Sequence, residues 1–182
     1  MIKLCIFSTF LLFAWSSVVQ GFSTTARTAL VIDNTTGDVL LSKDIDRPIP
    51  PASMSKLMTL FMVFESLEEG KIKMDDTFRV SRKAWAKGGS KMFVREGASV
   101  TIENLIKGVI IQSGNDACIV LAEGIAGTEE NFAELMTIRA KEIGLTNSNF
   151  KNSTGWPDPE HYMTSKDLVT LANKIREKYP SY

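Results

Sequence analysis

Residues 53–69 constrain the fold most, because they read as one helix that is apolar on almost every side. Gly70 follows as a stop signal. Its apolar side chains cover most of the helix circumference: Met54, Leu57, Met58, Leu60, Phe61, Val63, Phe64 and Leu67. A helix of this kind is normally buried on nearly all sides. We therefore expect it to be the central helix of its domain, with Ser53 in its first turn.

Residues 1–21 have the layout of a secretory signal peptide. Lys3 gives a positive start, residues 4–19 are almost wholly apolar, and Val19 and Gly21 are the small residues that a signal peptidase reads. The alternative is an uncleaved membrane anchor, but an apolar run of about 16 residues is shorter than the roughly 20 that span a bilayer. We expect cleavage after Gly21, export to the periplasm or cell envelope, and one domain over residues 22–182.

The charge and cysteine content of residues 22–182 exclude several classes of function. These residues carry 20 basic and 21 acidic side chains and no polybasic stripe, so neither nucleic acid nor anionic lipid is an expected partner. One histidine and one cysteine make a zinc site improbable, and no Walker A loop or GxGxxG motif is present. We expect no cofactor. Cys118 lies in an apolar run and is expected to be a small buried core residue.

The remaining patterns predict one β-hairpin followed mainly by helices. Strands are expected at 29–33 and 39–42, joined by a turn at 34–37, and at 77–81. Helices are expected at 102–112 after Thr101, at 116–125, from Thr128 to the stop at Gly144, and at 165–178 behind a capping box from Thr164 to Asp167. Residues 86–90 and 147–160 are expected to be irregular.

A hairpin and a set of helices make an α+β arrangement that lacks strands. Two strands alone are marginally stable, and a buried helix needs a cover. We therefore expect the domain to be incomplete in this chain, which would end before the remaining strands of the sheet.

Two Ser-x-x-Lys matches occur, and their contexts differ. Ser53 and Lys56 open the long apolar helix, so they lie one turn apart on one face. Ser148 and Lys151 lie in an irregular segment with no helix after it. Only the first pair has a predicted framework that would hold a hydroxyl beside an amine.

That spacing suits nucleophilic catalysis. A serine hydroxyl is a poor nucleophile until a nearby base removes its proton. A lysine serves as that base only if its pKa falls from about 10.4 toward 7, and burial disfavours its charged form. The free N–H groups and positive dipole end at the start of a helix also suit a developing oxyanion.

Ser113-Gly114-Asn115 is the second candidate element, at the predicted break between two helices. A turn there can direct both side chains into a cleft, with Ser113 relaying a proton and Asn115 hydrogen-bonding Lys56 and a substrate amide. The alternative is a simple helix-capping turn, since Ser, Gly and Asn all favour such positions.

Together these motifs resemble the serine penicillin-binding and β-lactamase superfamily, whose signature includes Ser-x-x-Lys, a Ser-x-Asn element and Lys-Thr-Gly. Several segments look like the low-molecular-mass D-Ala-D-Ala carboxypeptidases: residues 29–33, 51–59, 113–117, 152–156 and 161–165. The resemblance covers roughly residues 27–178. Ser-Gly-Asn, and the lack of a Glu-x-x-Leu-Asn segment, favour this branch over class A β-lactamases.

The resemblance implies a β-lactamase/transpeptidase-like fold and a penicillin-sensitive carboxypeptidase. Ser53 would attack the penultimate D-Ala carbonyl of a peptidoglycan stem peptide, Lys56 would accept its proton, and water would hydrolyse the acyl-enzyme. Penicillin would acylate the same serine. Ser113 and Asn115 would complete the catalytic set, and any membrane association would need a C-terminal anchor that this chain does not contain.

One departure from the family pattern is clear, because no Lys-Thr-Gly or Lys-Ser-Gly occurs in the 182 residues. In the family that strand binds the substrate carboxylate and completes the oxyanion hole, and losing one oxyanion donor costs about 10²–10³ in rate. We therefore expect little carboxypeptidase activity, and poor folding stability, from residues 22–182 alone.

Other interpretations of the sequence remain open. The enzyme alternatives are a β-lactamase and a peptidoglycan endopeptidase of the same superfamily, and a different class is a non-catalytic fragment that only binds peptidoglycan. A role for His161 in a Ser-His-Asp triad is a weaker interpretation than a structural role, since Lys56 already supplies a base. Trp85, Phe93 and Trp156 either line a peptide groove or belong to ordinary packing.

Overall fold

The structure is a computed structural model that describes residues 23–182, so the predicted signal peptide lies outside the described residues. Its elements are β1 (Ala29–Ile32), β2 (Val39–Lys43), the 3₁₀ helix η1 (Ala52–Ser55), α1 (Lys56–Glu68), β3 (Thr77–Arg79), α2 (Arg82–Ala86), β4 (Ser99–Thr101), α3 (Ile102–Gln112), α4 (Asn115–Ala126), α5 (Glu129–Glu142) and α6 (Ser165–Lys178).

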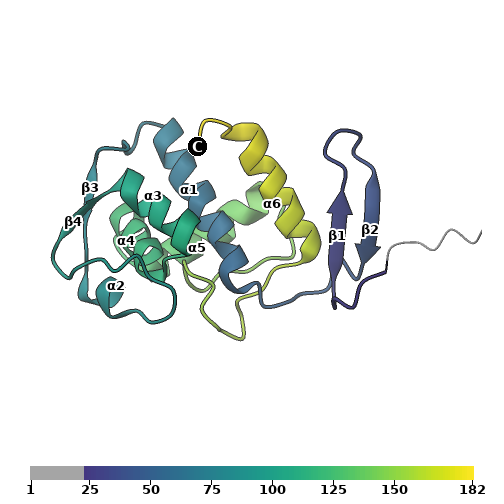
Figure 1. Ribbon diagram of the computed structural model, residues 1–182, viewed down its shortest axis with the longest axis horizontal. Helices are drawn as coiled ribbons and strands as arrows, with labels where there is room; N and C mark the ends of the chain where they lie inside the picture. Colours follow the sequence, from purple (N-terminus) through teal and green to yellow (C-terminus); the bar gives the residue numbers. More distant parts are fainter. Residues whose placement is uncertain (1–22) are drawn as a thin grey trace, which may run out of the picture.

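The apolar helix predicted at residues 53–69 is the centre of the helical cluster. It contacts α4, α5 and α6 (Figure 1), and most of its side chains are buried. Met58 and Val63 are fully enclosed, and Phe61 is 1% exposed. Burying side chains of this size contributes about 1.5–3 kcal/mol each, so packing around α1 is a major source of stability in this part of the chain.

Two ion pairs fix α1 against neighbouring helices. The Arg139 guanidinium on α5 donates to both carboxylate oxygens of Glu65, at 3.0 and 2.7 Å. Lys178 Nζ on α6 lies 3.1 Å from Glu65 Oε1. Because Glu65 lies well beyond the first turn of α1, these contacts set the position of the helix at the end remote from Ser53.

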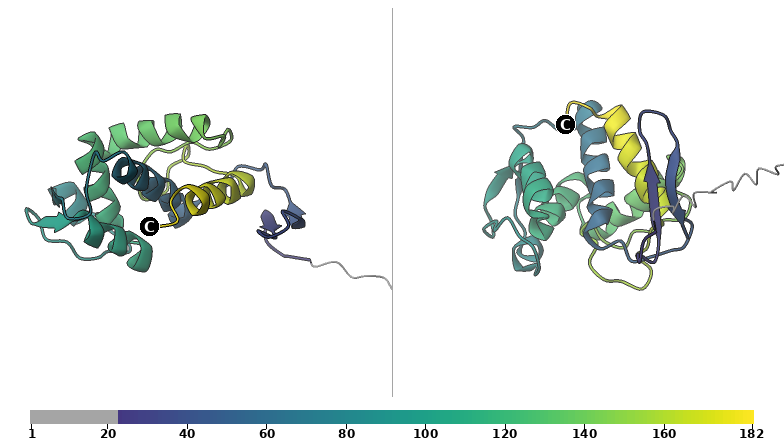
Figure 2. Two further views of the ribbon diagram at one scale, coloured as in Figure 1. Left: turned by 90° about the horizontal axis from the view of Figure 1, so that it is seen from above. Right: turned by 45° about the vertical axis from the view of Figure 1, so that its right-hand side comes forward.

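Two small antiparallel sheets lie at opposite ends of the molecule. The β1–β2 hairpin lies beyond α6, and the β3–β4 pair, whose strands are separated in the chain by α2, lies at the far end next to α2 and α4 (Figures 1 and 2). The first hairpin was predicted, and Asp33 stabilises its turn by accepting from the Thr35 amide at 2.7 Å. The α+β class is thus confirmed, with two two-stranded sheets among the described residues.

Most predicted helix starts are confirmed by their caps. The hydroxyls of Thr101, Thr128 and Thr164 accept from backbone amides three residues on, at 3.3, 3.1 and 3.1 Å. The capping box at α6 is only half formed. The Asp167 carboxylate accepts instead from Asn147 N and Ser148 Oγ, at 2.9 and 2.7 Å, and so fastens the preceding loop to α6.

Two elements escaped prediction. The short helix α2 begins before the segment that we expected to be irregular, and its Ser81 cap accepts from the Ala84 amide at 3.0 Å. Strand β4 pairs with β3, with Phe78 opposite Val100. Neither element has a clear period of its own, and β4 is not joined to β3 by a short turn of the kind that marks the first hairpin. No helix within residues 23–182 is long and apolar enough to cross a bilayer.

Candidate active site

The Ser53 hydroxyl and the Lys56 amine meet as the sequence predicted, but in a different kind of helix. Ser53 belongs to the 3₁₀ turn η1, and α1 itself begins at Lys56 rather than at Ser53. In a 3₁₀ helix side chains three residues apart are eclipsed, which brings the two groups into register. Lys56 Nζ lies 2.9 Å from Ser53 Oγ, within hydrogen-bonding distance.

The two partners differ in exposure. Ser53 is exposed to solvent, whereas Lys56 is 4% exposed. No carboxylate of the described chain forms an ion pair with this lysine. Burial lowers the pKa of Lys56 from its ordinary value, opposed by the nearby Cys118 thiol. An accessible hydroxyl therefore lies beside an amine that loses its proton more readily than a free lysine.

Ser53 also lies at the free end of its helix. The first hydrogen bond of η1 runs from Met54 N to Pro51 O, at 3.1 Å. The Ser53 amide precedes that bond and belongs to the N–H groups that a helix start leaves without intrahelical partners. This amide is suitably placed to stabilise negative charge that develops next to Ser53 Oγ.

The second Ser-x-x-Lys match has a structural role. Ser148 is buried and donates its hydroxyl to Asp167 at 2.7 Å, and Lys151 Nζ lies 3.2 Å from Glu160. The two side chains therefore have different partners, and the contextual choice of Ser53 over Ser148 is supported by the geometry.

The Ser113-Gly114-Asn115 turn lies at the junction of α3 and α4. Ser113 ends α3 in the left-handed conformation, with φ 53°, and Asn115 is the first residue of α4. Helix α1, which begins at Lys56, contacts α4, and Lys56 and Cys118 are both buried. Asn115 and Cys118 are three residues apart and share one face of α4.

The predicted hydrogen bond between Asn115 and Lys56 is absent from the described residues, and Ser113 makes none to Lys56 either. The Asn115 amide nitrogen donates instead to Gly88 O at 2.9 Å. Its amide oxygen accepts no hydrogen bond from residues 23–182, so it retains the capacity to accept one from a ligand or from Lys56.

The loop at residues 88–94 forms one side of the site and is fastened to α4. Asp116 is fully buried and accepts from Met92 N and Val94 N, at 2.9 and 3.2 Å. Between these two residues Phe93 has φ 62° and is 80% exposed. Asp116 therefore holds the loop while the aromatic ring of Phe93 stands in solvent.

Residues 152–156 form a neighbouring part of the site. The side-chain oxygen Asn152 Oδ1 accepts from the backbone amides of Thr154 and Trp156, at 3.1 and 2.9 Å, which closes the segment into a turn. A Cβ added at Gly155 would lie 1.9 Å from Ala52 O, the residue before Ser53. A Cβ added at Gly89 would lie 2.7 Å from Asn115 Nδ2 and 3.3 Å from the Trp156 ring. The turn thus bridges the Ser53 and Asn115 elements.

Gly155→Ala is expected to damage both stability and the site. Gly155 has φ +77°, and its Cβ would overlap the Ala52 carbonyl, so we expect a loss of about 2–5 kcal/mol in the free energy of unfolding. Gly37→Ala is the matched control, because Gly37 has φ +80° with nothing within 4 Å. Chemical denaturation of both variants measures the difference, and equal losses would contradict the proposed overlap.

His161 occupies a structural position. It is 3% exposed, its Nδ1 accepts from Lys151 N at 3.3 Å, and its ring packs edge-on against Phe150. Burial lowers the pKa of His161 and so favours the neutral ring, whereas the nearby Asp158 has the opposite, smaller effect. No hydrogen bond joins His161 to Ser53 in the described structure, in agreement with the predicted structural role.

The other singled-out residues divide between core and surface. Cys118 is fully buried as expected, and burial raises the pKa of its thiol to about 12. Trp85, Phe93 and Trp156 are all exposed, and Lys87 Nζ lies 4.2 Å from the centre of the Trp156 ring. Trp156 therefore lies at the site, beside Gly89 and Asn115.

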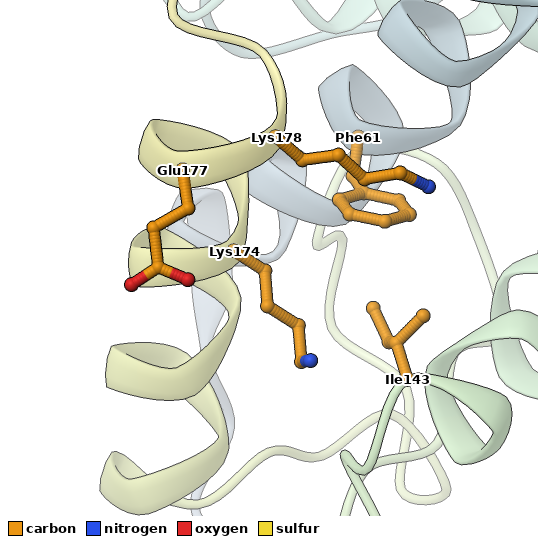
Figure 3. A pocket seen from close by; sticks show the side chains of 5 residues that line it. All are labelled: Phe61, Ile143, Lys174, Glu177 and Lys178. Carbon is orange, nitrogen blue, oxygen red and sulfur yellow. The ribbon is translucent and has the colours of Figure 1, made fainter.

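A separate hollow lies away from these residues. It has a volume of about 390 Å³ and lies between α1, α6 and the end of α5 (Figure 3), lined by Phe61, Ile143, Lys174, Glu177 and Lys178. Lys178 is already paired with Glu65. The hollow holds no nucleophile and none of the site residues, so the Ser53–Lys56 pair is the stronger indication of chemistry.

Comparison with known proteins shows the family of this chain. Residues 16–182 match the family model described as Peptidase_S11, D-alanyl-D-alanine carboxypeptidase. The chain is 42% identical over 156 residues to D-alanyl-D-alanine carboxypeptidase DacF of Bacillus subtilis, covering 86% of this chain and 40% of the relative.

Solved structures give the same result. The D-alanyl-D-alanine carboxypeptidase DacD from Francisella tularensis superposes with a TM-score of 0.85 at 38% identity, over 88% of this chain and 39% of that one. Penicillin binding protein 5 from Haemophilus influenzae superposes with a TM-score of 0.84 at 34% identity, over 89% of this chain and 48% of that one. The chain spans less than half the length of these relatives. It belongs to the D-alanyl-D-alanine carboxypeptidase family.

Proposed function

We propose that the protein is a serine-type D-Ala-D-Ala carboxypeptidase, in which Ser53 is the nucleophile and Lys56 its general base. The observation that carries this proposal is the 2.9 Å contact between an exposed hydroxyl and a buried amine without a carboxylate partner among the described residues. Family membership favours a peptidoglycan stem peptide as substrate and β-lactams as inhibitors.

The chemistry runs in two steps. Lys56 Nζ accepts the proton from Ser53 Oγ as the oxygen attacks the penultimate D-Ala carbonyl, and the Ser53 amide donates to the oxyanion. Terminal D-alanine leaves after its nitrogen gains a proton. Water then hydrolyses the ester, which regenerates Ser53 and releases the shortened peptide.

Ser113 and Asn115 are assigned supporting roles. Asn115 begins α4, which contacts α1, and its amide oxygen accepts no hydrogen bond from residues 23–182, so it can accept from a substrate N–H. Ser113 relays a proton between Lys56 and the leaving amine. Residues 1–21 would export the protein to the periplasm or cell envelope, where this substrate is found.

Release of D-alanine from a pentapeptide ending in D-Ala-D-Ala tests the function. The intact protein is incubated with the pentapeptide, with a cross-linked peptide dimer, and with a chromogenic cephalosporin. We expect D-alanine from the pentapeptide and a long-lived acyl-enzyme with the cephalosporin. Preferential cleavage of the dimer would indicate an endopeptidase. Rapid turnover of the cephalosporin would indicate a β-lactamase, and binding of these peptides without reaction would indicate a non-catalytic protein.

A further inference from the structure

A buried carboxylate that the mechanism does not use lies behind the site. Glu129, in the first turn of α5, is 4% exposed. Its Oε1 accepts from Ser153 N at 3.1 Å and from Ser153 Oγ at 2.8 Å. Its Oε2 lies 2.9 Å from Lys83 Nζ on α2. A buried charge with three partners orients all of them, because breaking any contact leaves it uncompensated.

Ser153 connects this carboxylate to the helix that carries Lys56. The Ser153 carbonyl accepts from Thr59 Oγ1 at 2.6 Å, and Thr59 is fully buried on α1, one turn after Lys56. Ser153 is itself fully buried. Its position is therefore set from two sides, by α1 and by Glu129.

The residues after Ser153 transmit that position to the nucleophile. The backbone of Gly155 packs so closely on η1 that an added Cβ would lie 1.9 Å from Ala52 O and 2.6 Å from Ser55 Oγ. Ala52 and Ser55 belong to the single 3₁₀ turn that holds Ser53. A shift of Gly155 must therefore shift the turn that presents the nucleophile.

Lys83 connects the same carboxylate to the other side of the site. It lies on α2, which is followed directly by Lys87, Gly88 and Gly89. Gly88 O accepts from Asn115 Nδ2 at 2.9 Å, and Lys87 Nζ lies over the Trp156 ring. The Glu129 carboxylate thus binds both the 153–156 turn behind Ser53 and helix α2, which leads into Gly88, the partner of Asn115.

From these contacts we infer that Glu129 is a positioning residue for Ser53: it fixes the 153–156 turn against η1 and ties that turn to α2. The inference rests on the proposed function, since its readout is acylation of Ser53. It assigns to Glu129 a role beyond the favourable helix-dipole position expected for an acidic residue in the first turn.

Glu129→Gln tests this inference, with Glu130→Gln as the matched control. The introduced amide has one oxygen where the carboxylate of Glu129 has two, so either Ser153 or Lys83 loses its acceptor. Glu130 contacts the same lysine at 2.6 Å but is exposed and does not contact Ser153. Both substitutions therefore remove one negative charge beside Lys83, and only the first reaches the turn behind Ser53.

The measurement is the rate of acylation of the intact protein by fluorescent penicillin, as a function of penicillin concentration. We expect Glu129→Gln to lower the saturating acylation rate by about 10- to 100-fold, because small displacements of reacting groups have effects of this size. The penicillin concentration that gives half of the maximal acylation rate should change less than about threefold, since Glu129 lies behind the nucleophile rather than against the ligand. Glu130→Gln should stay within about twofold of the wild type.

A second variant separates positioning from folding. Lys83→Met combined with Glu129→Gln removes the ammonium that competes for the amide oxygen, so the introduced amide can again accept from Ser153, and part of the acylation rate should return. Melting curves show whether each variant is folded at the assay temperature.

Equal acylation rates for Glu129→Gln and Glu130→Gln, or a change confined to the penicillin concentration at half-saturation, would overturn the inference and leave the proposed function intact. A wild-type protein that is not acylated would refute the function itself.

Discussion

Ser53→Ala is expected to abolish covalent labelling by fluorescent penicillin and to reduce D-alanine release by at least about 10⁴-fold. The substitution removes the oxygen that we propose forms the acyl-enzyme, and the rest of η1 should be unchanged. Ser53 is exposed, and among residues 23–182 its side chain hydrogen-bonds only with Lys56. Folding stability should therefore change little, by roughly 0.5 kcal/mol or less.

Ser148→Ala is the control for the labelling experiment, because Ser148 begins the other Ser-x-x-Lys match. Its hydroxyl bonds to Asp167, so the variant should lose stability by about 1 kcal/mol and keep its labelling. Mass spectrometry of the labelled peptide identifies the acylated residue. Labelling that persists in the Ser53 variant would remove Ser53 as the nucleophile.

Lys56→Met is expected to lower the acylation rate by about 10²–10⁴-fold, the usual contribution of a general base. Methionine has a similar length and no ionisable group, so the buried space stays filled. Lys56→Arg should be equally inactive, because a guanidinium keeps its proton at all accessible pH values. A variant that retains wild-type rates would assign the base to another group.

The acylation rate should also rise with pH. Only the neutral amine of Lys56 can accept the Ser53 proton, and burial lowers its pKa from the ordinary 10.5. The rate should therefore increase through this lowered pKa and level off below pH 10.5. Stopped-flow acylation from about pH 5 upward measures the profile, and a flat profile would contradict the assignment.

The contribution of Lys56 to folding stability should also depend on pH. Because the folded-state pKa of Lys56 is depressed, the unfolded chain binds more protons, and this residue's contribution to stability rises with pH between the lowered pKa and 10.5. Below the lowered pKa its buried charge opposes folding. Lys56→Met should thus be at least as stable as the wild type at about pH 7, while its activity is lost.

The sequence by itself determined the features that depend on neighbouring residues. The spacing of apolar side chains fixed α1 as the buried helix, and threonines before amphipathic runs fixed the starts of α3, α5 and α6. The Ser53–Lys56 pair also belongs here, because a three-residue spacing brings two side chains together in either an α- or a 3₁₀ helix.

Only the tertiary structure decided the rest, because the decisive partners lie far apart in the chain. The Asn115 amide has a partner 27 residues away at Gly88, and Ser153 is 24 residues from Glu129. In sequence, Glu129 is like any exposed first-turn residue, and Gly155 is like any turn glycine. The burial of Glu129 beside Lys83 and the close approach of Gly155 to Ala52 follow from tertiary packing, which no local pattern of residues encodes.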